Sequence, residues 1–451
     1  SADDPALISL QKAHLIESRG CESAIMNKLR QRSAHLWHGP SLHILILTLR
    51  CDQACVYCHA SRRSDKARGV DMSKATANRA LDVIFQSPSP DLTIEFQGGE
   101  PSLHFDLLRH VVEEAYRRAD QQQRKVRFSL VSNLGQLSQD QMDFLVEAGV
   151  LVCTSLDGPA DLHDANRPWK MGSSHAATLA KMKAFEAAYQ TRGLDPELAT
   201  INALVTVSRA SLAKPEAIID QYVDLGHKVL HLRPLNPFGM GAKVFAQHGY
   251  DAEAFLDFYH RAFTHLLTLN RQGVEIMEKT ASLFLTRILT DRDPNYMDLR
   301  SPCGAGIGQM AYHFDGRVYT CDEGRMLGTM GDDMFCMGNV HEHDYAQLIR
   351  HNAVRSACVA SCLECLPGCS DCAYAPYCGV CPVYNYATEG DLVARSPSND
   401  RCKIQMGILD MLFLALEDKK TLDLLSRWTL ERDRSSVYQR QGGLTVSKPN
   451  S

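Results

Sequence analysis

The 451-residue sequence has no excess of basic residues, no long apolar run and no export signal. Its 48 Lys and Arg residues are outnumbered by 53 Asp and Glu residues, and the formal net charge of −5 argues against nucleic acid as a partner. The longest apolar stretch, 408–416, is shorter than the roughly 18 residues that a membrane-spanning helix requires. The first residues, Ser-Ala-Asp-Asp-Pro, lack the basic and then apolar pattern of a secretory signal. We therefore expect a cytoplasmic protein that binds neither nucleic acid nor membrane.

Cysteine, in contrast, is abundant: the chain has 16, and eleven of them lie between Cys303 and Cys402. Small secreted proteins use many cysteines as disulfides, but this chain is long and shows no export signal. Clustered cysteines in a cytoplasmic chain indicate metal or iron–sulfur ligation instead. Cys21 and Cys153 stand apart from the other cysteines and are expected to bind no metal. Cys153 falls within an apolar run, which predicts a place in the core.

Strand-like and helix-like segments alternate between residues 42 and 232, which predicts an α/β fold with a parallel sheet and right-handed crossovers. The six strand-like runs are 42–49, 92–96, 126–131, 150–155, 201–207 and 228–232. The helical patterns between them cover 73–86, 103–119, 138–147, 174–190 and 211–225. The strand-like runs are apolar on both faces, as strands covered by helices should be. Periodicity leaves open whether the sheet closes into a barrel.

The sequence outside this alternation divides into further predicted segments. Residues 1–40 are expected to form a helical extension before the α/β domain at 41–240, and 241–300 a helical bridge after it. Residues 301–405 are rich in Gly and Cys and have little periodicity, so we expect metal coordination to organise them. Residues 406–451 are predicted to form a last amphipathic helix and a polar tail.

The first group of cysteines directly follows the first predicted strand, in the sequence Cys51-Asp52-Gln53-Ala54-Cys55-Val56-Tyr57-Cys58. Its three thiols can converge on one inorganic cluster at the carboxyl ends of the strands, where α/β active sites form. A structural zinc site needs four ligands, whereas three thiolates on a [4Fe–4S] cluster leave one iron open for substrate. The alternative is a zinc site that His59 completes.

This C-x3-C-x2-C spacing, with Tyr57 before the third cysteine, resembles the signature of the radical S-adenosylmethionine (radical SAM) superfamily. The resemblance implies a partial (β/α)6 barrel in which Cys51, Cys55 and Cys58 hold a [4Fe–4S] cluster, with SAM chelating the open iron. One-electron reduction would cleave SAM to methionine and a 5′-deoxyadenosyl radical, which abstracts a substrate hydrogen. A flavodoxin- or ferredoxin-type protein is the expected electron donor.

Motifs at later strand ends resemble SAM-binding positions of the same family. Gln97-Gly98-Gly99-Glu100-Pro101 resembles the GGEP motif, in which glycines permit close approach to a ligand and the carboxylate holds the SAM amino group. Ser155, in Ser-Leu-Asp-Gly-Pro, and Arg167, in His-Asp-Ala-Asn-Arg, match residues that contact the ribose and carboxylate of SAM. The alternative for this pair is an ordinary turn and a surface arginine. The expected SAM contacts are Tyr57, Gly98, Gly99, Glu100, Ser132, Asn133, Ser155, Arg167 and, after the sixth strand, Leu235.

The C-terminal cysteines resemble a SPASM domain, which carries two auxiliary [4Fe–4S] clusters. By this resemblance auxiliary cluster I is held by Cys303, Cys321 and Cys381. Auxiliary cluster II is held by Cys369, Cys372, Cys378 and Cys402. Gln309 stands where fully ligated relatives have the fourth cysteine of cluster I. Cluster I is therefore expected to have an open iron or to recruit Cys336.

A second C-x3-C-x2-C motif is formed by Cys358, Cys362 and Cys365. The eleven C-terminal cysteines either complete two auxiliary clusters, with one of these three donating to cluster I, or support a third auxiliary cluster. Two clusters are favoured because no strand precedes this motif. The cysteines left open as cluster ligands are Cys336, Cys358, Cys362 and Cys365.

Asp322 follows Cys321 directly. In SPASM relatives that mature sulfatases, this Asp is the candidate base that deprotonates the substrate. The alternative is a hydrogen-bonding Asp that steadies the cluster loop.

The resemblance as a whole implies an enzyme that oxidises or crosslinks a residue of a ribosomally made precursor peptide or protein. The sequence around the C-terminal cysteines is most similar to His-Xaa-Ser-type peptide maturases, and a partner maturase is a further expected partner. One alternative is an anaerobic sulfatase maturase that forms formylglycine. Another is an iron–sulfur electron-transfer or zinc-binding scaffold without catalysis, which the combined SAM motifs disfavour.

Overall fold

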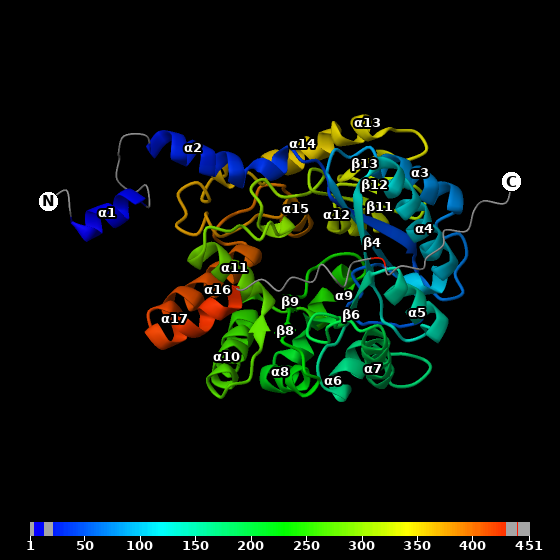
Figure 1. Ribbon diagram of the computed structural model, residues 1–451, viewed down its shortest axis with the longest axis horizontal. Coiled ribbons are helices and arrows are strands. Elements are labelled where there is room, and N and C mark those ends of the chain that lie inside the picture. Colours follow the sequence, from blue (N-terminus) through cyan, green and yellow to red (C-terminus); the bar gives the residue numbers. More distant parts are fainter. Residues whose placement is uncertain (1–3, 13–20, 430–439, 441–451) are drawn as a thin grey trace.

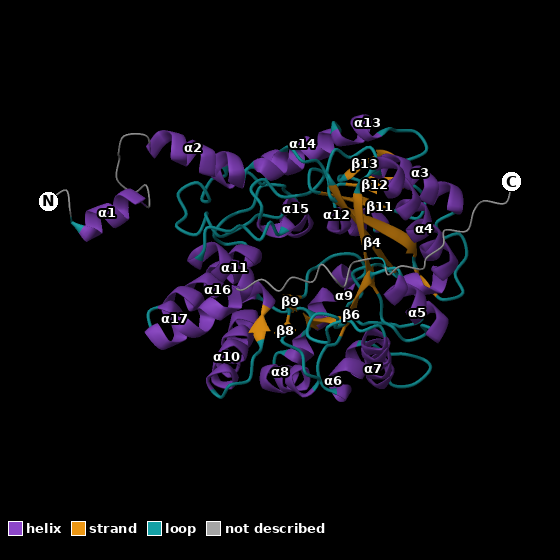
Figure 2. Ribbon diagram, in the orientation of Figure 1, coloured by secondary structure: helices purple, strands orange, loops and turns teal. Residues whose placement is uncertain are grey.

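The computed structural model describes residues 4–12, 21–429 and 440, and a nine-stranded sheet runs through its centre (Figure 2). The strand order is β13-β12-β11-β1-β4-β5-β6-β7-β9. Seven consecutive members are parallel, of which β11 (Gln309–Tyr312) comes from the cysteine-rich segment. The other six are the barrel strands β1 (Leu42–Thr48), β4 (Asp91–Gly98), β5 (Lys125–Val131), β6 (Val150–Ser155), β7 (Asn202–Val207) and β9 (Leu232–Pro234). The predicted α/β fold with six parallel strands is confirmed. β9 and β13 form the two edges, so the barrel is partial.

Helices join the parallel strands and cover the outer side of the sheet (Figure 1). They are α3 (Lys74–Ile84), α4 (Phe105–Gln122), α5 (Gln139–Glu147), α6 (Ala160–Asn166), α7 (Ser174–Thr191) and α8 (Pro215–Asp224). In α4, Leu108, Val111, Val112 and Ala115 recur at helical spacing and are fully buried, which explains why this segment is a helix packed on the sheet. The helix predicted at 211–225 begins later, because Pro215 occupies its first position.

The predicted extent of the sixth strand, 228–232, is wrong. The chain instead forms β8 (Val229–Leu230), which pairs with β10 (Met277–Glu278), and then β9, which pairs with β7. The Glu278 carboxylate accepts a hydrogen bond from the Leu232 N–H at 3.2 Å. This bond fixes the point at which the chain passes from one sheet to the other.

The cysteine-rich segment contains three strands that the sequence pattern did not predict: β11 (Gln309–Tyr312), β12 (Arg317–Tyr319) and β13 (Cys336–Asn339). β11 pairs in parallel with β1, and β12 and β13 continue the sheet in antiparallel fashion. Strands of three or four residues are too short to show a period. Backbone pairing with the barrel therefore organises this segment in addition to any metal.

The remaining elements are mostly helices at the periphery. Near the N-terminal half they are α1 (Pro5–Lys12), α2 (Cys21–Arg32), η1 (Ala34–Leu36), β2 (Arg50–Cys51), β3 (Arg63–Ser64), η2 (Pro101–His104) and η3 (Arg209–Ser211). Beyond the barrel they are α9 (Gly241–His248), α10 (Ala252–Arg271), α11 (Lys279–Leu289), η4 (Met297–Leu299), α12 (Asp322–Thr329), α13 (Tyr345–Ile349), α14 (Asn352–Val359), η5 (Leu363–Cys365), α15 (Pro382–Glu389), α16 (Asp400–Leu416), α17 (Lys419–Ser426) and η6 (Arg427–Thr429).

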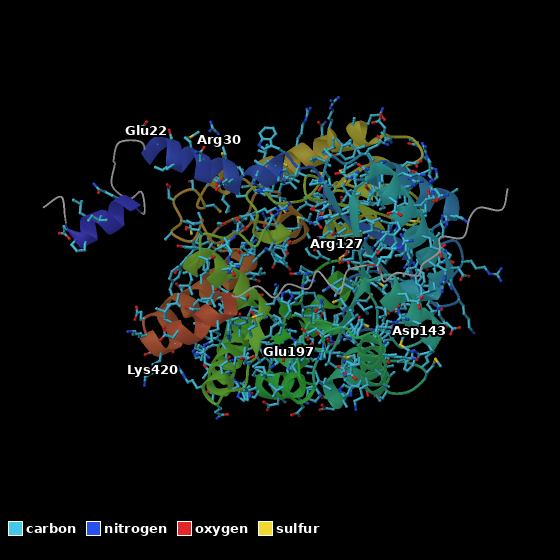
Figure 3. All side chains as sticks on the ribbon, in the orientation of Figure 1. Glu22, Arg30, Arg127, Asp143, Glu197 and Lys420 are labelled. Carbon is cyan, nitrogen blue, oxygen red and sulfur yellow. The ribbon has the colours of Figure 1, made fainter. Side chains whose placement is uncertain are left out.

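The helices α10, α11, α16 and α17 pack on one another beside the barrel. Charged side chains on the outer helices point away from the core, as Glu22 and Arg30 on α2 and Lys420 on α17 illustrate (Figure 3). Among residues 4–12, 21–429 and 440, no helix combines the length and apolar character needed to cross a lipid bilayer.

Candidate active site

A cavity of about 620 Å³ lies at the carboxyl ends of the parallel strands, and we call it the barrel cavity. Most of the predicted site residues line it: Cys51, Cys55, Tyr57, Cys58, Gly98, Gly99, Glu100, Ser132, Asn133, Ser155, Arg167 and Asp322. Leu235 instead lines a second cavity of about 530 Å³. The two cavities adjoin, since Arg233, Tyr296 and Glu323 contribute to the walls of both.

The Cys loop, residues 51–58, is fastened by the chain segment that follows α6. The Ala54 N–H donates to the Pro168 carbonyl at 2.8 Å, and the Val56 N–H donates to the Asn166 carbonyl at 2.9 Å. These two bonds lie on either side of the middle thiol. The loop conformation therefore depends on residues more than 100 positions later in the sequence.

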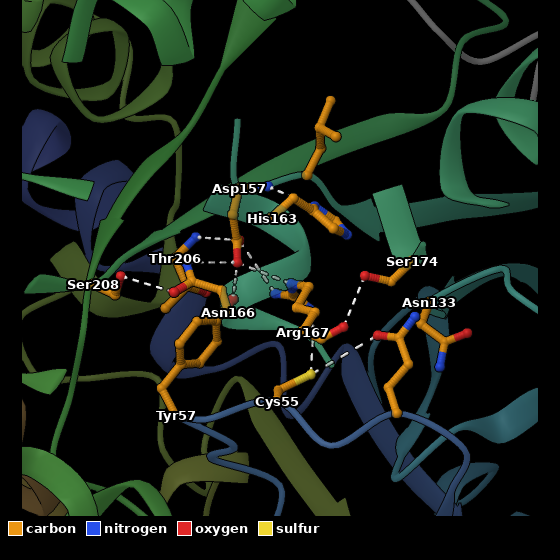
Figure 4. A network of polar contacts seen from close by, with 12 residues as sticks. Cys55, Tyr57, Asn133, Asp157, His163, Asn166, Arg167, Ser174, Thr206 and Ser208 are labelled. Carbon is orange, nitrogen blue, oxygen red and sulfur yellow. Dashed lines mark hydrogen bonds and ion pairs between the residues drawn. The ribbon is translucent and has the colours of Figure 1, made fainter. Parts of the chain in front are cut away.

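The buried carboxylate of Asp157 organises the polar groups around the Cys loop (Figure 4). It accepts hydrogen bonds from the Tyr57 hydroxyl, from Nδ2 of Asn166 at 3.2 Å and from the Thr206 N–H at 3.4 Å. Arg167 forms an ion pair with it, with 3.1 Å between Nε and Oδ2. The Asp157 side chain is 0% exposed and that of Arg167 is 10% exposed, so water screens this pair weakly.

Arg167 connects Asp157 to the Cys loop. Its Nη1 atom lies 3.8 Å from Cys55 Sγ, and its guanidinium carbon lies 5.3 Å from the centre of the Tyr57 ring. Burial raises the pKa of the Cys55 thiol to about 11, and the positive charge of Arg167 opposes this rise. A cation in this position favours the thiolate, which is the form that binds metal. A direct contact between Arg167 and SAM stays a prediction.

The Gly-Gly pair at the end of β4 packs against the backbone that leads into the Cys loop. A Cβ atom on Gly98 would lie 2.1 Å from the Thr48 carbonyl oxygen, and one on Gly99 would lie 2.2 Å from the Arg50 carbonyl oxygen. Gly98 also has a φ of 145°, which side-chain-bearing residues rarely adopt. The approach that requires glycine here is to the chain's own backbone, whereas the sequence suggested an approach to a ligand.

Glu100 joins the Gly-Gly pair to the end of β5. Its Oε1 accepts hydrogen bonds from the Ser102 N–H at 3.0 Å and the Ser132 hydroxyl at 2.8 Å, and its Oε2 accepts one from the Asn133 N–H at 2.7 Å. Burial raises the pKa of the Glu100 carboxyl, and these hydrogen bonds oppose the rise. Both oxygens therefore already have partners within the chain, and a contact between Glu100 and the SAM amino group stays a prediction.

Asp52 also holds the Cys loop, and sequence reasoning did not single it out. Its carboxylate accepts hydrogen bonds from Nδ2 of Asn133 at 2.8 Å, Nε2 of Gln136 at 2.9 Å and Nε1 of Trp169 at 2.9 Å. Asn133 Nδ2 also lies 3.9 Å from Cys51 Sγ. These partners are distant in sequence, so the only available signal was the position of Asp52 directly after Cys51.

Asp322, the first residue of α12, faces the barrel cavity from the cysteine-rich segment. Its Oδ1 accepts a hydrogen bond from Arg325 Nε at 2.7 Å, and the Arg325 side chain is 0% exposed. This ion pair agrees with the alternative of a structural Asp, and the role of a base stays a prediction. Glu323, which the sequence did not indicate, lines the same cavity, and burial raises the pKa of its carboxyl.

Cys303, Cys321 and Cys381 are buried in one cluster of mainly apolar side chains with Phe238. Burial raises the pKa of the Cys381 thiol to about 11. The structure thus brings together three cysteines from separate parts of the chain. That they hold auxiliary cluster I stays a prediction. Gln309, at the position of the missing cysteine, lines the barrel cavity.

Cys369, Cys372, Cys378 and Cys402 line a third cavity of about 250 Å³. Burial raises the pKa of the Cys378 thiol to about 12, and the neighbouring Cys402 adds to the rise. Cys381 borders the same cavity, so the two predicted auxiliary sites are neighbours. Four thiols can hold a [4Fe–4S] cluster, and the ligation of auxiliary cluster II by these cysteines stays a prediction.

The four cysteines whose roles the sequence left open are Cys336, Cys358, Cys362 and Cys365, and none of them lies in the two groups just described. Cys336, the first residue of β13, packs in a different apolar cluster with side chains of β1, β11 and β12, and its sulfur contacts the Gly338 carbonyl at 3.6 Å. The structure therefore does not bring Cys336 to the thiols predicted for cluster I. Cys358 packs against the main core, whereas the Cys362 and Cys365 sulfur atoms lie 3.8 Å apart near the surface.

The prediction that Cys153 belongs to the apolar core is wrong. Its side chain lines the barrel cavity, because successive residues of β6 face opposite sides and Val152 takes the core side. Glu95 of β4 and Arg233 of β9 also line this cavity, and the sequence pattern indicated neither. The side chain of Cys21 lies outside the described part of the chain.

The class of this domain follows from the fold, the Cys loop and one comparison. The sequence model of the radical SAM superfamily matches residues 45–192, which include the Cys loop and the strands β4, β5 and β6. Residues 45–192 therefore form a radical SAM domain. A domain of this class implies a [4Fe–4S] cluster and SAM as cofactors.

Two curated relatives match smaller shares of the sequence. An uncharacterized protein of Methanocaldococcus jannaschii is 30% identical over 129 residues, which are 29% of this chain and 42% of that protein. A cysteine-type anaerobic sulfatase-maturating enzyme of Clostridium perfringens is 28% identical over 134 residues, which are 28% of this chain and 36% of that protein. The chain thus matches less than half of the length of either relative.

Solved structures are similar over most of the chain. The structure of native anSMEcpe with bound AdoMet has a TM-score of 0.69 at 18% identity, and the match covers 86% of this chain and 99% of that chain. Streptococcus suis SuiB bound to S-adenosylmethionine has a TM-score of 0.57 at 12% identity, covering 87% of this chain and 86% of that chain. At these identities the similarity establishes the fold alone.

The residues of the barrel cavity suit the cofactors of this class. Three thiols line a cavity of about 620 Å³, with the Arg167 cation beside one of them, which is the donor set of a cluster with one open iron. No three His, Cys, Asp or Glu side chains in the described ranges are grouped to hold a single metal ion. A cubane differs from a single ion, because each thiolate binds a separate iron.

Proposed function

We propose that the chain is a radical SAM enzyme that abstracts hydrogen from a peptide or protein and thereby oxidises or crosslinks one of its residues. The observation that carries this proposal is the Cys loop, which holds three thiols against a cavity large enough for a cofactor and a substrate side chain. A peptide substrate is supported by two related structures. Native anSMEcpe has been solved with a bound Cp18Cys peptide, and SuiB with its precursor peptide SuiA.

In this proposal Cys51, Cys55 and Cys58 would hold the cluster, and Ser155 and Arg167 would contact SAM. The cluster and SAM, when bound, would supply the radical chemistry that removes hydrogen from the substrate. The chain contributes orientation, since the Asp157 network and the Asp52 carboxylate fix the loop from two sides. It also limits access of water, because the cavity lies between the strand ends and the cysteine-rich segment.

Residues 301–405 would act as a SPASM domain with two auxiliary clusters. Cys303, Cys321 and Cys381 would hold cluster I, and Cys369, Cys372, Cys378 and Cys402 would hold cluster II. These clusters would bind the substrate or accept an electron from it. Asp322, whose Oδ1 already accepts a hydrogen bond from Arg325, would accept the substrate proton at its other oxygen. A flavodoxin or ferredoxin would supply electrons, and a partner maturase would help to present the peptide.

A second candidate is an anaerobic sulfatase maturase, which forms formylglycine. It is supported by the 28% identity to the Clostridium perfringens sulfatase-maturating enzyme and by the likeness to anSMEcpe. The two candidates share the hydrogen abstraction and differ in the product. They therefore require the same cofactors and are distinguished by the product.

The test uses anaerobic, cluster-loaded protein with SAM, a reductant and a precursor peptide encoded beside its gene. A peptide that loses hydrogen without gaining an aldehyde, as mass spectrometry before and after hydrazine labelling measures, supports the proposal. A peptide in which Cys or Ser becomes formylglycine supports the second candidate. An unchanged peptide, with SAM cleaved at the same rate in its absence, contradicts a peptide-modifying role.

A further inference from the structure

Two cysteines of the second C-x3-C-x2-C motif lie side by side at the surface. The Sγ atoms of Cys362 and Cys365 are 3.8 Å apart, at the two ends of the turn that contains η5. Cys365 is exposed and Cys362 is partly exposed. A disulfide has about 2.05 Å between its sulfur atoms, so these two need to approach by only about 1.8 Å.

The third cysteine of the motif does not join this pair. Cys358 lies on α14 and packs against side chains of the main core. In the Cys loop, by contrast, all three thiols line one cavity. The second motif thus repeats the spacing of the first without its convergent geometry. Neither Cys362 nor Cys365 contributes to the walls of the three cavities described above.

The turn is fastened to the chain beside Cys303. The Leu363 N–H donates to the Ser301 hydroxyl at 3.0 Å, and that hydroxyl donates to the Glu364 carboxylate at 2.7 Å. The Ser361 hydroxyl in turn accepts a hydrogen bond from the Cys303 N–H at 2.9 Å. These bonds hold the turn that carries the pair at the surface, and they connect this turn to the backbone of Cys303, a predicted ligand of cluster I.

We propose that Cys362 and Cys365 form a surface dithiol that exchanges with disulfides and does not bind a cluster. Cys365, the more exposed thiol, attacks one sulfur of a disulfide, forms a mixed disulfide and releases one thiolate. Cys362 then attacks the mixed disulfide, forms the Cys362–Cys365 bond and releases the second thiolate. Two electrons pass from the chain to the disulfide reagent, and the two protons that the cysteines lose are taken up by the two released thiolates.

The sequence offers a direct readout, because Glu364 lies between the two cysteines. Anaerobic, cluster-loaded protein is treated with oxidised glutathione, blocked with N-ethylmaleimide and cleaved after Arg and Glu residues. Cleavage after Arg355, Glu364 and Glu389 places the two cysteines on separate fragments, 356–364 and 365–389. We expect these fragments to stay joined until a reductant is added, while the iron content of the protein does not change.

Single substitutions separate the dithiol from a third cluster. Cys362→Ser should abolish the link, trap one glutathione on Cys365 and keep the full iron content. Cys358→Ser, the matched control within the same motif, should retain the link. The proposal is overturned if wild type gives no link, if the link runs through Cys358, or if Cys362→Ser or Cys365→Ser loses about four irons per chain.

Discussion

Removing the Tyr57 hydroxyl tests whether the Asp157 network holds the Cys loop. Tyr57→Phe keeps the aromatic ring against Arg167 and deletes only the hydrogen bond to the buried carboxylate. Asp157 retains its bonds from Asn166 and Arg167, so the barrel should still fold. The effect should therefore be confined to the link between the loop and the strand ends.

The size of the effect follows from the burial of Asp157, which is 0% exposed. A hydrogen bond to a buried charged group contributes about 1.5–3 kcal/mol, and about 1.4 kcal/mol corresponds to a factor of ten in an equilibrium. If the bond stabilises the closed loop, the population of opened loops rises about 10- to 150-fold in Tyr57→Phe.

The assay is the rate at which a chelator removes iron from anaerobic, cluster-loaded protein. The iron of one cluster should leave Tyr57→Phe about 10- to 150-fold faster than it leaves wild type, and the remaining iron at the wild-type rate. Tyr116→Phe is the matched control, since this hydroxyl is also buried but donates to the Ala148 carbonyl, outside the barrel cavity. Equal rates for Tyr57→Phe and wild type would refute the reasoning.

Three further predictions concern other parts of the account. Gly99→Ala should prevent loading of the cluster in the Cys loop, because its Cβ would lie 2.2 Å from the Arg50 carbonyl oxygen; a normal iron content would contradict this. Cys372→Ala should still cleave SAM but yield no modified peptide. Equal loss of SAM cleavage and of peptide modification would contradict the assignment of Cys372 to an auxiliary cluster. Burial lowers the pKa of His43 to about 3 from its ordinary value of 6.5. The neutral His43 side chain therefore contributes its full share to the stability of the folded chain above pH 6.5, and this contribution declines as the pH falls. Urea unfolding should therefore show the free energy of unfolding of wild type falling between pH 7.5 and pH 5. The corresponding fall in His43→Asn should be smaller by about 2 kcal/mol, and equal falls in the two proteins would contradict this prediction.

Local spacing was sufficient to predict the parts of the site that are contiguous in sequence. The three thiols of the Cys loop and the pair Gly98 and Gly99 fall within short motifs, and the structure brings both to one cavity. The first five parallel strands were predicted because each spans six to eight residues and shows an apolar run. The sixth was misplaced, since the chain near Leu232 passes between two sheets.

Contacts between distant residues could not be read from the sequence. The bond between Tyr57 and Asp157 spans 100 positions, and that between Asp52 and Trp169 spans 117. The orientation of Cys153 depends on which side of β6 faces the barrel cavity, and an apolar run does not reveal this. Spacing alone was also misleading, because the second C-x3-C-x2-C motif does not bring its three thiols together.

The measurement that tests the central claim most directly is the formation of 5′-deoxyadenosine from SAM by anaerobic, reduced, cluster-loaded protein. The account predicts that wild type forms 5′-deoxyadenosine and that Cys58→Ala does not. Cys358→Ser, a substitution outside the barrel cavity, should retain the activity. Absence of 5′-deoxyadenosine from wild type with its full iron content, or normal formation by Cys58→Ala, would contradict the account.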